Sequence, residues 1–143
     1  MPRHFEQRIL PYAPDAIFDL VADIERYPAF LPWCHEARIR ERKGNVITAD
    51  LIVGTKVFHD TFTSIITLER PGRISVEYGG GPLEHLSNEW RFMPKNGDVC
   101  ELTFYVDFAF RSQLMGAMIN LFFDKAFRKM ATAFEERAKE LYG

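Results

Sequence analysis

Three polar residues, Asp60, Ser64 and Asn88, fall on segments whose alternate residues are apolar. Because successive side chains of a strand point to opposite faces, each of the three shares a face with rings such as Phe62 or Trp90. A buried polar group needs a hydrogen-bond partner, which can be a side chain, a water or a ligand. The pattern therefore has two interpretations. These residues are either bonded internally or turned outward by bulges, or they orient the polar head of a ligand in an apolar pocket.

The sequence contains no motif that is typical of a metal site or of a catalytic nucleophile. The four histidines, His4, His35, His59 and His85, stand on separate segments, and none forms a pair at metal-ligand spacing. His59 and His85 fall on the polar side of their strands and are predicted to lie at the surface. No serine has a neighbour in a recognised catalytic motif. We expect no catalytic residue, no metal and no cofactor other than a bound apolar molecule.

Charge does not favour a nucleic-acid-binding protein. The chain has 18 Lys and Arg against 20 Asp and Glu, a net charge of -2, and we expect no contact with DNA. One local exception is a basic stripe, in which Arg38, Arg40 and Arg42 share one strand face and Lys43 follows. The stripe is either a solvated strand face or a contact for RNA or anionic lipid.

The segment from Tyr27 to Cys34 combines two prolines with the large apolar residues Phe30, Leu31 and Trp33. Over the longer stretch from Ile24 to Cys34, the prolines allow at most one short helical turn. Its aromatic residues can staple an early helix to a sheet. Alternatively, Tyr27 and the three apolar residues form a mobile gate or a surface that touches a membrane, since exposing them is costly without a function.

The elements that position these residues follow from periodicity. Residues 4–10 predict a strand, and residues 15–22 predict a helix with Pro14 in its first turn. Between residues 37 and 111 apolar residues alternate with polar ones, which predicts about six strands. The strands are divided by turn residues at Gly44-Asn45, Gly54, Pro71-Gly72, Gly79 to Pro82 and Asn96-Gly97, and the glycines at 79–81 can also form a bulge.

After Ser112 the period becomes helical, and the helix is apolar almost all round between Leu114 and Phe123. A helix this apolar is covered on more than one side or lines a cavity. We therefore predict an α+β fold of one domain, residues 1–143, with a long C-terminal helix on the aromatic face of an antiparallel sheet. The candidate cavity-lining residues are Phe58, Phe62, Trp90, Phe104, Phe108, Met118 and Phe122, with Asp60, Ser64 and Asn88 as polar candidates.

The two cysteines, Cys34 and Cys100, lie far apart and indicate free thiols in a reducing cytoplasm. The longest apolar stretch covers about half of the roughly 20 residues that a membrane-spanning helix needs. We expect a soluble cytoplasmic protein, whose contact with the inner membrane would be peripheral.

Three motifs carry a resemblance to a known family. The residues from Tyr27 to Cys34, YPAFLPWC, follow VADIE and resemble the hallmark of the coenzyme Q-binding START-like family, whose bacterial members include ribosome association toxin. The stretches GPLEHL from Gly81 and AFEERA from Ala133 are similar as well, so that the resemblance covers essentially the whole chain. Leu83 stands where that family's pattern has Phe.

The resemblance implies a helix-grip fold, in which a curved antiparallel sheet wraps around a long C-terminal helix with an apolar cavity between them. It implies binding of ubiquinone or a related polyprenyl lipid by a carrier or chaperone that supports respiration. For some bacterial relatives it implies instead contact with the large ribosomal subunit that blocks subunit joining. The wider superfamily includes polyketide cyclases, and only Asp60 could supply an acid or base in such a cavity.

Overall fold

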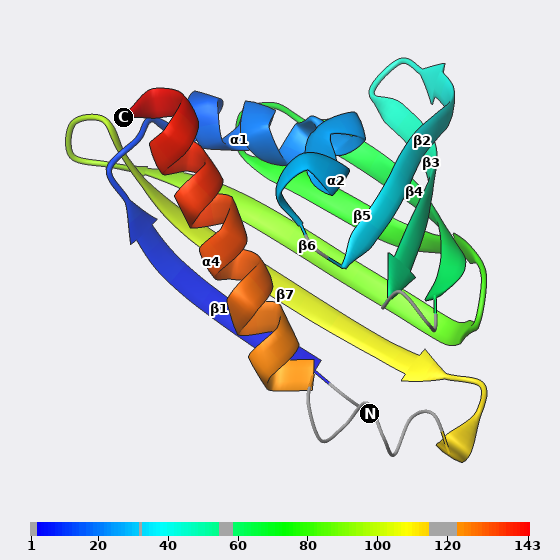
Figure 1. The fold of residues 1–143 in the computed structure, drawn as a ribbon. Coiled ribbons are helices and arrows are strands. Elements are labelled where there is room, and N and C mark those ends of the chain that lie inside the picture. Colours follow the sequence, from blue (N-terminus) through cyan, green and yellow to red (C-terminus); the bar gives the residue numbers. More distant parts are fainter. Residues whose placement is uncertain (1–2, 32, 55–58, 115–122) are drawn as a thin grey trace.

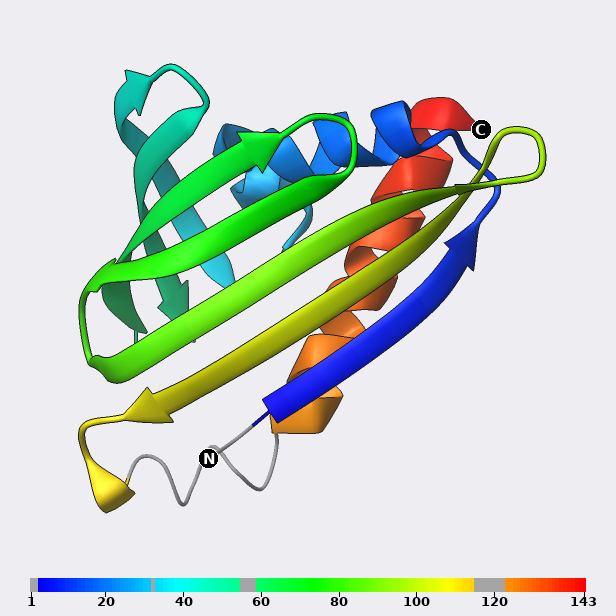
Figure 2. The same cartoon turned by 180° about the vertical axis from the view of Figure 1, so that it is seen from behind.

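The computed structural model describes residues 3–31, 33–54, 59–114 and 123–143. The strands are β1 (Arg3–Leu10), β2 (Cys34–Lys43), β3 (Val46–Gly54), β4 (His59–Glu69), β5 (Arg73–Gly80), β6 (Leu83–Lys95) and β7 (Val99–Phe110). The helices are α1 (Pro14–Ala22), α2 (Tyr27–Phe30) and α4 (Phe123–Tyr142), with a 3-10 turn at Ile24–Arg26. Figure 1 shows α4 crossing one face of the sheet, and Figure 2 shows the opposite face.

The sheet is a meander that its first strand extends. Its order is β1-β7-β6-β5-β4-β3-β2, so each strand from β2 to β7 pairs with its neighbour in sequence, and β1 pairs with β7. All neighbouring strands are antiparallel. Gly44 and Gly97, in two of the predicted turns, adopt φ values of 62° and 72°, which favour glycine.

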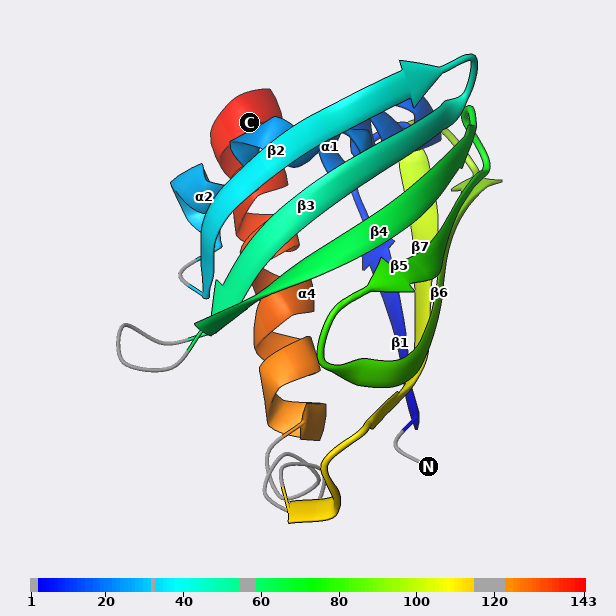
Figure 3. The same ribbon diagram turned by 90° about the vertical axis from the view of Figure 1, so that its right-hand side faces the viewer.

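A β-bulge interrupts the pairing of β4 with β5. Thr63 pairs with Gly80, but Ser64 pairs with Tyr78, so Gly79 is the extra residue of the bulge. The bulge confirms one of the two predictions for residues 79–81. A bulge bends its strand, and Figure 3 shows the sheet curving around α4.

One face of the sheet and one side of α4 form the core. In β7 every second residue from Cys100 to Phe108 is buried, and the residues between them are only partly buried. From α4, Met130, Phe134 and Ala138 are buried as well. The predicted architecture, a curved antiparallel sheet with a long C-terminal helix, is therefore confirmed.

The early helical segments close one end of the covered face (Figure 1). Pro14 is the first residue of α1 and Pro28 the second residue of α2, within the first turn of a helix, where no backbone N–H is needed. The sequence predicts at most one short helical turn between Ile24 and Cys34. The structure has two, the 3-10 turn and α2, because Pro28 starts a helix as readily as it stops one.

Three predicted lining residues, Phe58, Met118 and Phe122, lie outside the described residues. The described helices include none that is long and apolar enough to cross a membrane.

Candidate ligand-binding cavity

Side chains on the covered face of the sheet form rows that cross the strands. The register places Ile66 of β4 opposite Val76 of β5, Val76 opposite Asn88 of β6, and Asn88 opposite Val106 of β7. Directly opposite side chains on one face lie close enough to touch. This row of three aliphatic side chains and one amide forms the floor of the site.

Above the floor, between the sheet and α4, lies a cavity of about 400 Å³. Its lining is almost entirely apolar and comes from strands β3 to β7, the three described α-helices, the 3-10 turn and the chain between α2 and β2. A cavity of this size and character suits a small apolar ligand. The predicted candidates that line it are Tyr27, Leu31, Trp33, Phe62, Ser64, Asn88, Trp90, Phe104 and Phe108.

Phe134 of α4 anchors the helix over the cavity. Its ring centroid lies 5.4 Å from that of Tyr27, 5.2 Å from that of Phe30 and 5.1 Å from that of Trp90, with each pair edge to face. Edge-to-face contacts stabilise aromatic pairs beyond the burial of their surface. Phe134 thus joins α2, α4 and β6 in one aromatic cluster.

The two polar candidates on the cavity floor have different surroundings. The Asn88 amide donates to the Tyr105 carbonyl oxygen at 2.8 Å and accepts from the Trp90 indole N–H at 3.1 Å. For Asn88 the structure therefore favours internal bonding, although its side chain still borders the cavity. Ser64 is only 4% exposed and lines the cavity, and its hydroxyl makes no hydrogen bond to any described residue. Its hydroxyl is free to bond a ligand.

Asp60 does not border the cavity, although the alternation of β4 and its pairing with Val53 put it on the same face as Phe62. It is exposed and not among the residues that line the cavity, and its carboxylate accepts a hydrogen bond of 2.8 Å from the N–H of Thr61. The prediction that Asp60 lines the cavity is wrong. Asp60 is the second residue of β4, and at this end of the strand the side chain has no cover.

The four gate candidates pack against the core, and none of them is fully exposed to solvent. Leu31 is 1% exposed, and the Tyr27 hydroxyl donates to the Val21 carbonyl oxygen, where burial raises the pKa of the phenol. Phe30 is half-buried, does not line the cavity, and has the Arg137 guanidinium 5.4 Å from its ring centroid. Trp33 is half-buried and borders the cavity. This geometry favours the interpretation of an aromatic staple, which holds α4 as well as the sheet.

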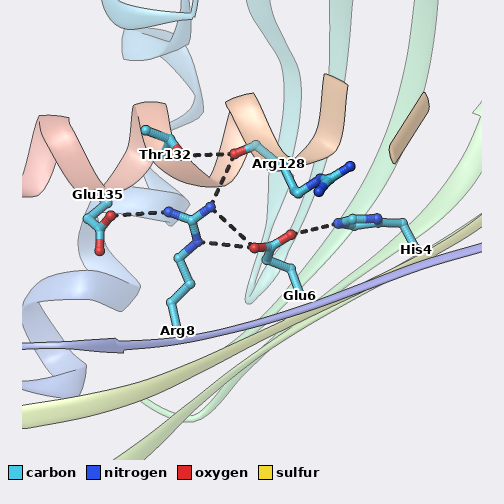
Figure 4. A network of polar contacts seen from close by, with 6 residues as sticks. All are labelled: His4, Glu6, Arg8, Arg128, Thr132 and Glu135. Carbon is cyan, nitrogen blue, oxygen red and sulfur yellow. Dashed lines mark hydrogen bonds and ion pairs between the residues drawn. The ribbon is translucent and has the colours of Figure 1, made fainter. Parts of the chain in front are cut away.

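A polar network that the sequence analysis did not identify joins β1 to α4 (Figure 4). His4 Nε2 lies 2.8 Å from Glu6 Oε1, and Glu6 Oε2 accepts from Arg8 at 3.2 Å. Arg8 also donates to Glu135 at 3.1 Å and to the Arg128 carbonyl oxygen at 3.3 Å. The network fixes α4 along the β1 side of the cavity.

His4 connects this network to the cavity wall. Its side chain is buried, and its ring stacks on Phe127 at 5.7 Å and is tilted against Phe104 at 6.4 Å. Both phenylalanines line the cavity. The sequence contains one signal for this position of His4. The alternation of residues 4–10 places His4 on the same face as Leu10, which is a core residue.

The predicted basic stripe does not lie on one face. A register shift in the middle of β2 places Arg38 opposite Asp50 but Arg42 opposite Ile47, which is a buried core residue. Arg40 forms an ion pair of 3.6 Å with Asp50. The prediction of a continuous stripe is wrong, because a bulge reverses the alternation that the prediction assumed.

Both cysteines are free and buried. Burial raises the pKa of each thiol to about 11. The reactive thiolate is therefore scarce at neutral pH for Cys34 and Cys100 alike, as is typical of structural cysteines.

A curved antiparallel sheet that holds a long helix over an apolar cavity defines a helix-grip protein of the START-like class. The chain belongs to the polyketide cyclase / dehydrase and lipid transport family, whose model matches residues 10–135.

Two curated relatives and one solved structure illustrate the range of this family. The chain is 37% identical to a protein of Rickettsia prowazekii named ribosome association toxin RatA, with 94% of each chain covered. It is 32% identical to the mitochondrial coenzyme Q-binding protein COQ10 homolog B of Xenopus laevis, over 96% of this chain and 58% of that protein. The crystal structure of the Zhui aromatase/cyclase from Streptomyces sp. R1128 superposes with a TM-score of 0.86 at 18% identity, covering 96% and 93% of the two chains. That last likeness concerns the fold alone.

Proposed function

We propose that this protein binds ubiquinone or a related polyprenyl lipid in the cavity under α4 and acts as its carrier or chaperone in support of respiration. The observation that carries the proposal is the Ser64 hydroxyl, which bonds no described residue and lies in an almost entirely apolar cavity of about 400 Å³. Such a site offers one hydrogen bond to a polar head and apolar surface to a tail. The relative named as a coenzyme Q-binding protein supports the same ligand class.

Burial of the tail supplies the affinity without any catalytic group. Each buried CH₂ contributes about 0.8 kcal/mol, so ten buried carbons offer roughly 8 kcal/mol before the entropy of ordering the ligand is subtracted. Asp60, on which a cyclase mechanism would depend, is exposed outside the cavity lining. The curated relatives described above are also named as a binding protein and a toxin rather than as enzymes.

The direct test is to extract the purified protein with organic solvent and to identify the extract by mass spectrometry. We expect a prenylated quinone or a lipid in stoichiometric amount. If the protein carries nothing and does not bind ubiquinone in a titration, the proposed ligand class is wrong.

Ser64→Ala should weaken the binding of a short-tailed ubiquinone by about threefold to tenfold, the value of one lost hydrogen bond. Binding of an alkane of similar length should not change, because the alkane has no head group to bond. Both affinities can be measured by quenching of tryptophan fluorescence. The matched control is Ser87→Ala, which removes an exposed hydroxyl from β6. Equal losses for quinone and alkane would mean that Ser64 acts through packing alone.

A second candidate function is association with the large ribosomal subunit. The relative named ribosome association toxin, at 37% identity over 94% of the chain, favours it. Co-sedimentation with purified ribosomal subunits distinguishes the two functions, since a lipid carrier remains in the supernatant. The ion pairs of Arg38 with Glu36 and of Arg40 with Asp50 leave the basic stripe partly neutralised, which makes it a weak basis for RNA contact.

A further inference from the structure

The two edges of the sheet differ in how they are protected against pairing. Strand β2 has two register shifts, one after Cys34 and one after Ile39, and its exposed residues are mostly charged. Bulges and charges of this kind keep a free edge from accepting another strand. Strand β1 pairs with β7 through all 8 of its residues without a shift. In Figure 1 and Figure 2 no described strand lies beyond the outer edge of β1, which ends the sheet.

The exposed face of β1 carries two large apolar side chains. Phe5 is 61% exposed and Ile9 is 58% exposed, both on the convex side of the sheet. Glu6 and Arg8 point to the opposite side, where they bond each other and the rest of the network that joins β1 to α4. Gln7 lies between them in sequence and shares the convex side with Phe5 and Ile9. The order of types along the strand is therefore apolar, acidic, amide, basic and apolar, which is complementary to itself when it is read in reverse.

We propose that β1 pairs antiparallel with β1 of a second copy of this chain, about a two-fold axis at Gln7. In this register Phe5 lies opposite the second copy's Ile9, and Glu6 lies opposite the second copy's Arg8. Gln7 lies opposite the second copy's Gln7. The apolar pair and the oppositely charged pair each occur twice, as a two-fold interface requires.

Other registers are less favourable. The axis of an antiparallel pair of identical strands lies at a residue, because paired residues share the same hydrogen-bonding orientation. Two such registers pair seven of the eight residues of β1, with axes at Glu6 and at Gln7. An axis at Glu6 places two carboxylates against each other and Phe5 against an amide. The axis at Gln7 pairs Phe5 with Ile9 twice and sets no like charges against each other, and this self-complementarity is the reason for assigning the edge to a second copy.

Sedimentation velocity over a concentration series tests the dimer, with charged substitutions at the two apolar positions. Phe5→Lys alone and Ile9→Glu alone each break both apolar pairs, and each should raise the dimer dissociation constant by about tenfold or more. The double variant places Lys at position 5 opposite Glu at position 9 of the second copy. It should restore the dissociation constant to within about threefold of the original, since opposite charges across a strand pair attract.

Met93→Lys is the matched control, because Met93 is 51% exposed on β6, away from the edge. It should leave the dimer unchanged, and thermal melts should show that all four variants remain folded. A second measurement uses Gln7→Cys, which should form a disulfide between copies on oxidation, whereas Phe5→Cys should not, because its counterpart lies four residues away from the opposing position. A single-chain mass at every concentration overturns the proposal. A dimer that survives the single substitutions, or one that the double variant fails to restore, overturns it as well.

Discussion

Val76→Trp should strongly weaken ligand binding at little cost to the fold. Val76 lies in the middle of the cavity floor, between Ile66 and Asn88, so an indole there projects into the space that the tail would fill. If the indole displaces about three methylene groups of the ligand, affinity falls on the order of fiftyfold. Titration with a short-tailed ubiquinone measures the loss.

The stability of Val76→Trp is the second part of the expected result. An indole that enters empty space should change the free energy of unfolding by less than about 1 kcal/mol, whereas overpacking a solid core costs about 1–3 kcal/mol. Glu77→Trp is the matched control, because Glu77 is the next residue of β5 and is exposed on the other face. Unchanged binding in Val76→Trp, together with a large loss of stability, would show that this part of the cavity does not receive the ligand.

Phe134→Ala should cause the largest loss of stability among the substitutions considered. Phe134 is 2% exposed and contacts Tyr27, Phe30 and Trp90, so its removal leaves a hole where α2, α4 and β6 meet. Truncation of a buried phenylalanine costs about 3–5 kcal/mol, a large share of the roughly 5–15 kcal/mol that stabilises a domain. Urea unfolding followed by circular dichroism measures the difference.

The control for this substitution lies on the same helix. Leu141 is 50% exposed, and Leu141→Ala should change the free energy of unfolding by no more than about 0.5 kcal/mol. If Phe134→Ala costs no more than Leu141→Ala, the aromatic cluster does not hold α4 in place.

The sequence predicts the sheet well because its strands alternate cleanly and its turns contain glycine. Phe62, Trp90, Phe104 and Phe108 were all expected on the covered face, and all line the cavity. Alternation fails for Asp60 because a period of two identifies a face but not the point at which its cover ends.

Two further differences come from pairing between distant segments. Asn88 and Ser64 look equivalent in sequence, yet the Asn88 amide bonds the carbonyl of Tyr105 on the next strand and the Ser64 hydroxyl bonds no described residue. The alternation within one strand shows which face a side chain takes, but not which groups of the neighbouring strand it reaches. His4 was missed for the same reason, since its stacking on Phe127 joins opposite ends of the chain.

The docking of β1 and α4 against the meander of β2 to β7 has a consequence for the order of folding. Hairpins from β2 to β7 can form locally, but the bond of Gln7 to Glu101 spans 94 positions and that of Arg8 to Glu135 spans 127. Contacts so distant in sequence form late, because the entropy of closing a long loop opposes them until other contacts exist. We expect pulsed hydrogen exchange to protect β4 to β6 before β1. Until β1 and α4 dock, the aromatic wall of the future cavity faces water, and the folding chain is then at its most prone to aggregate.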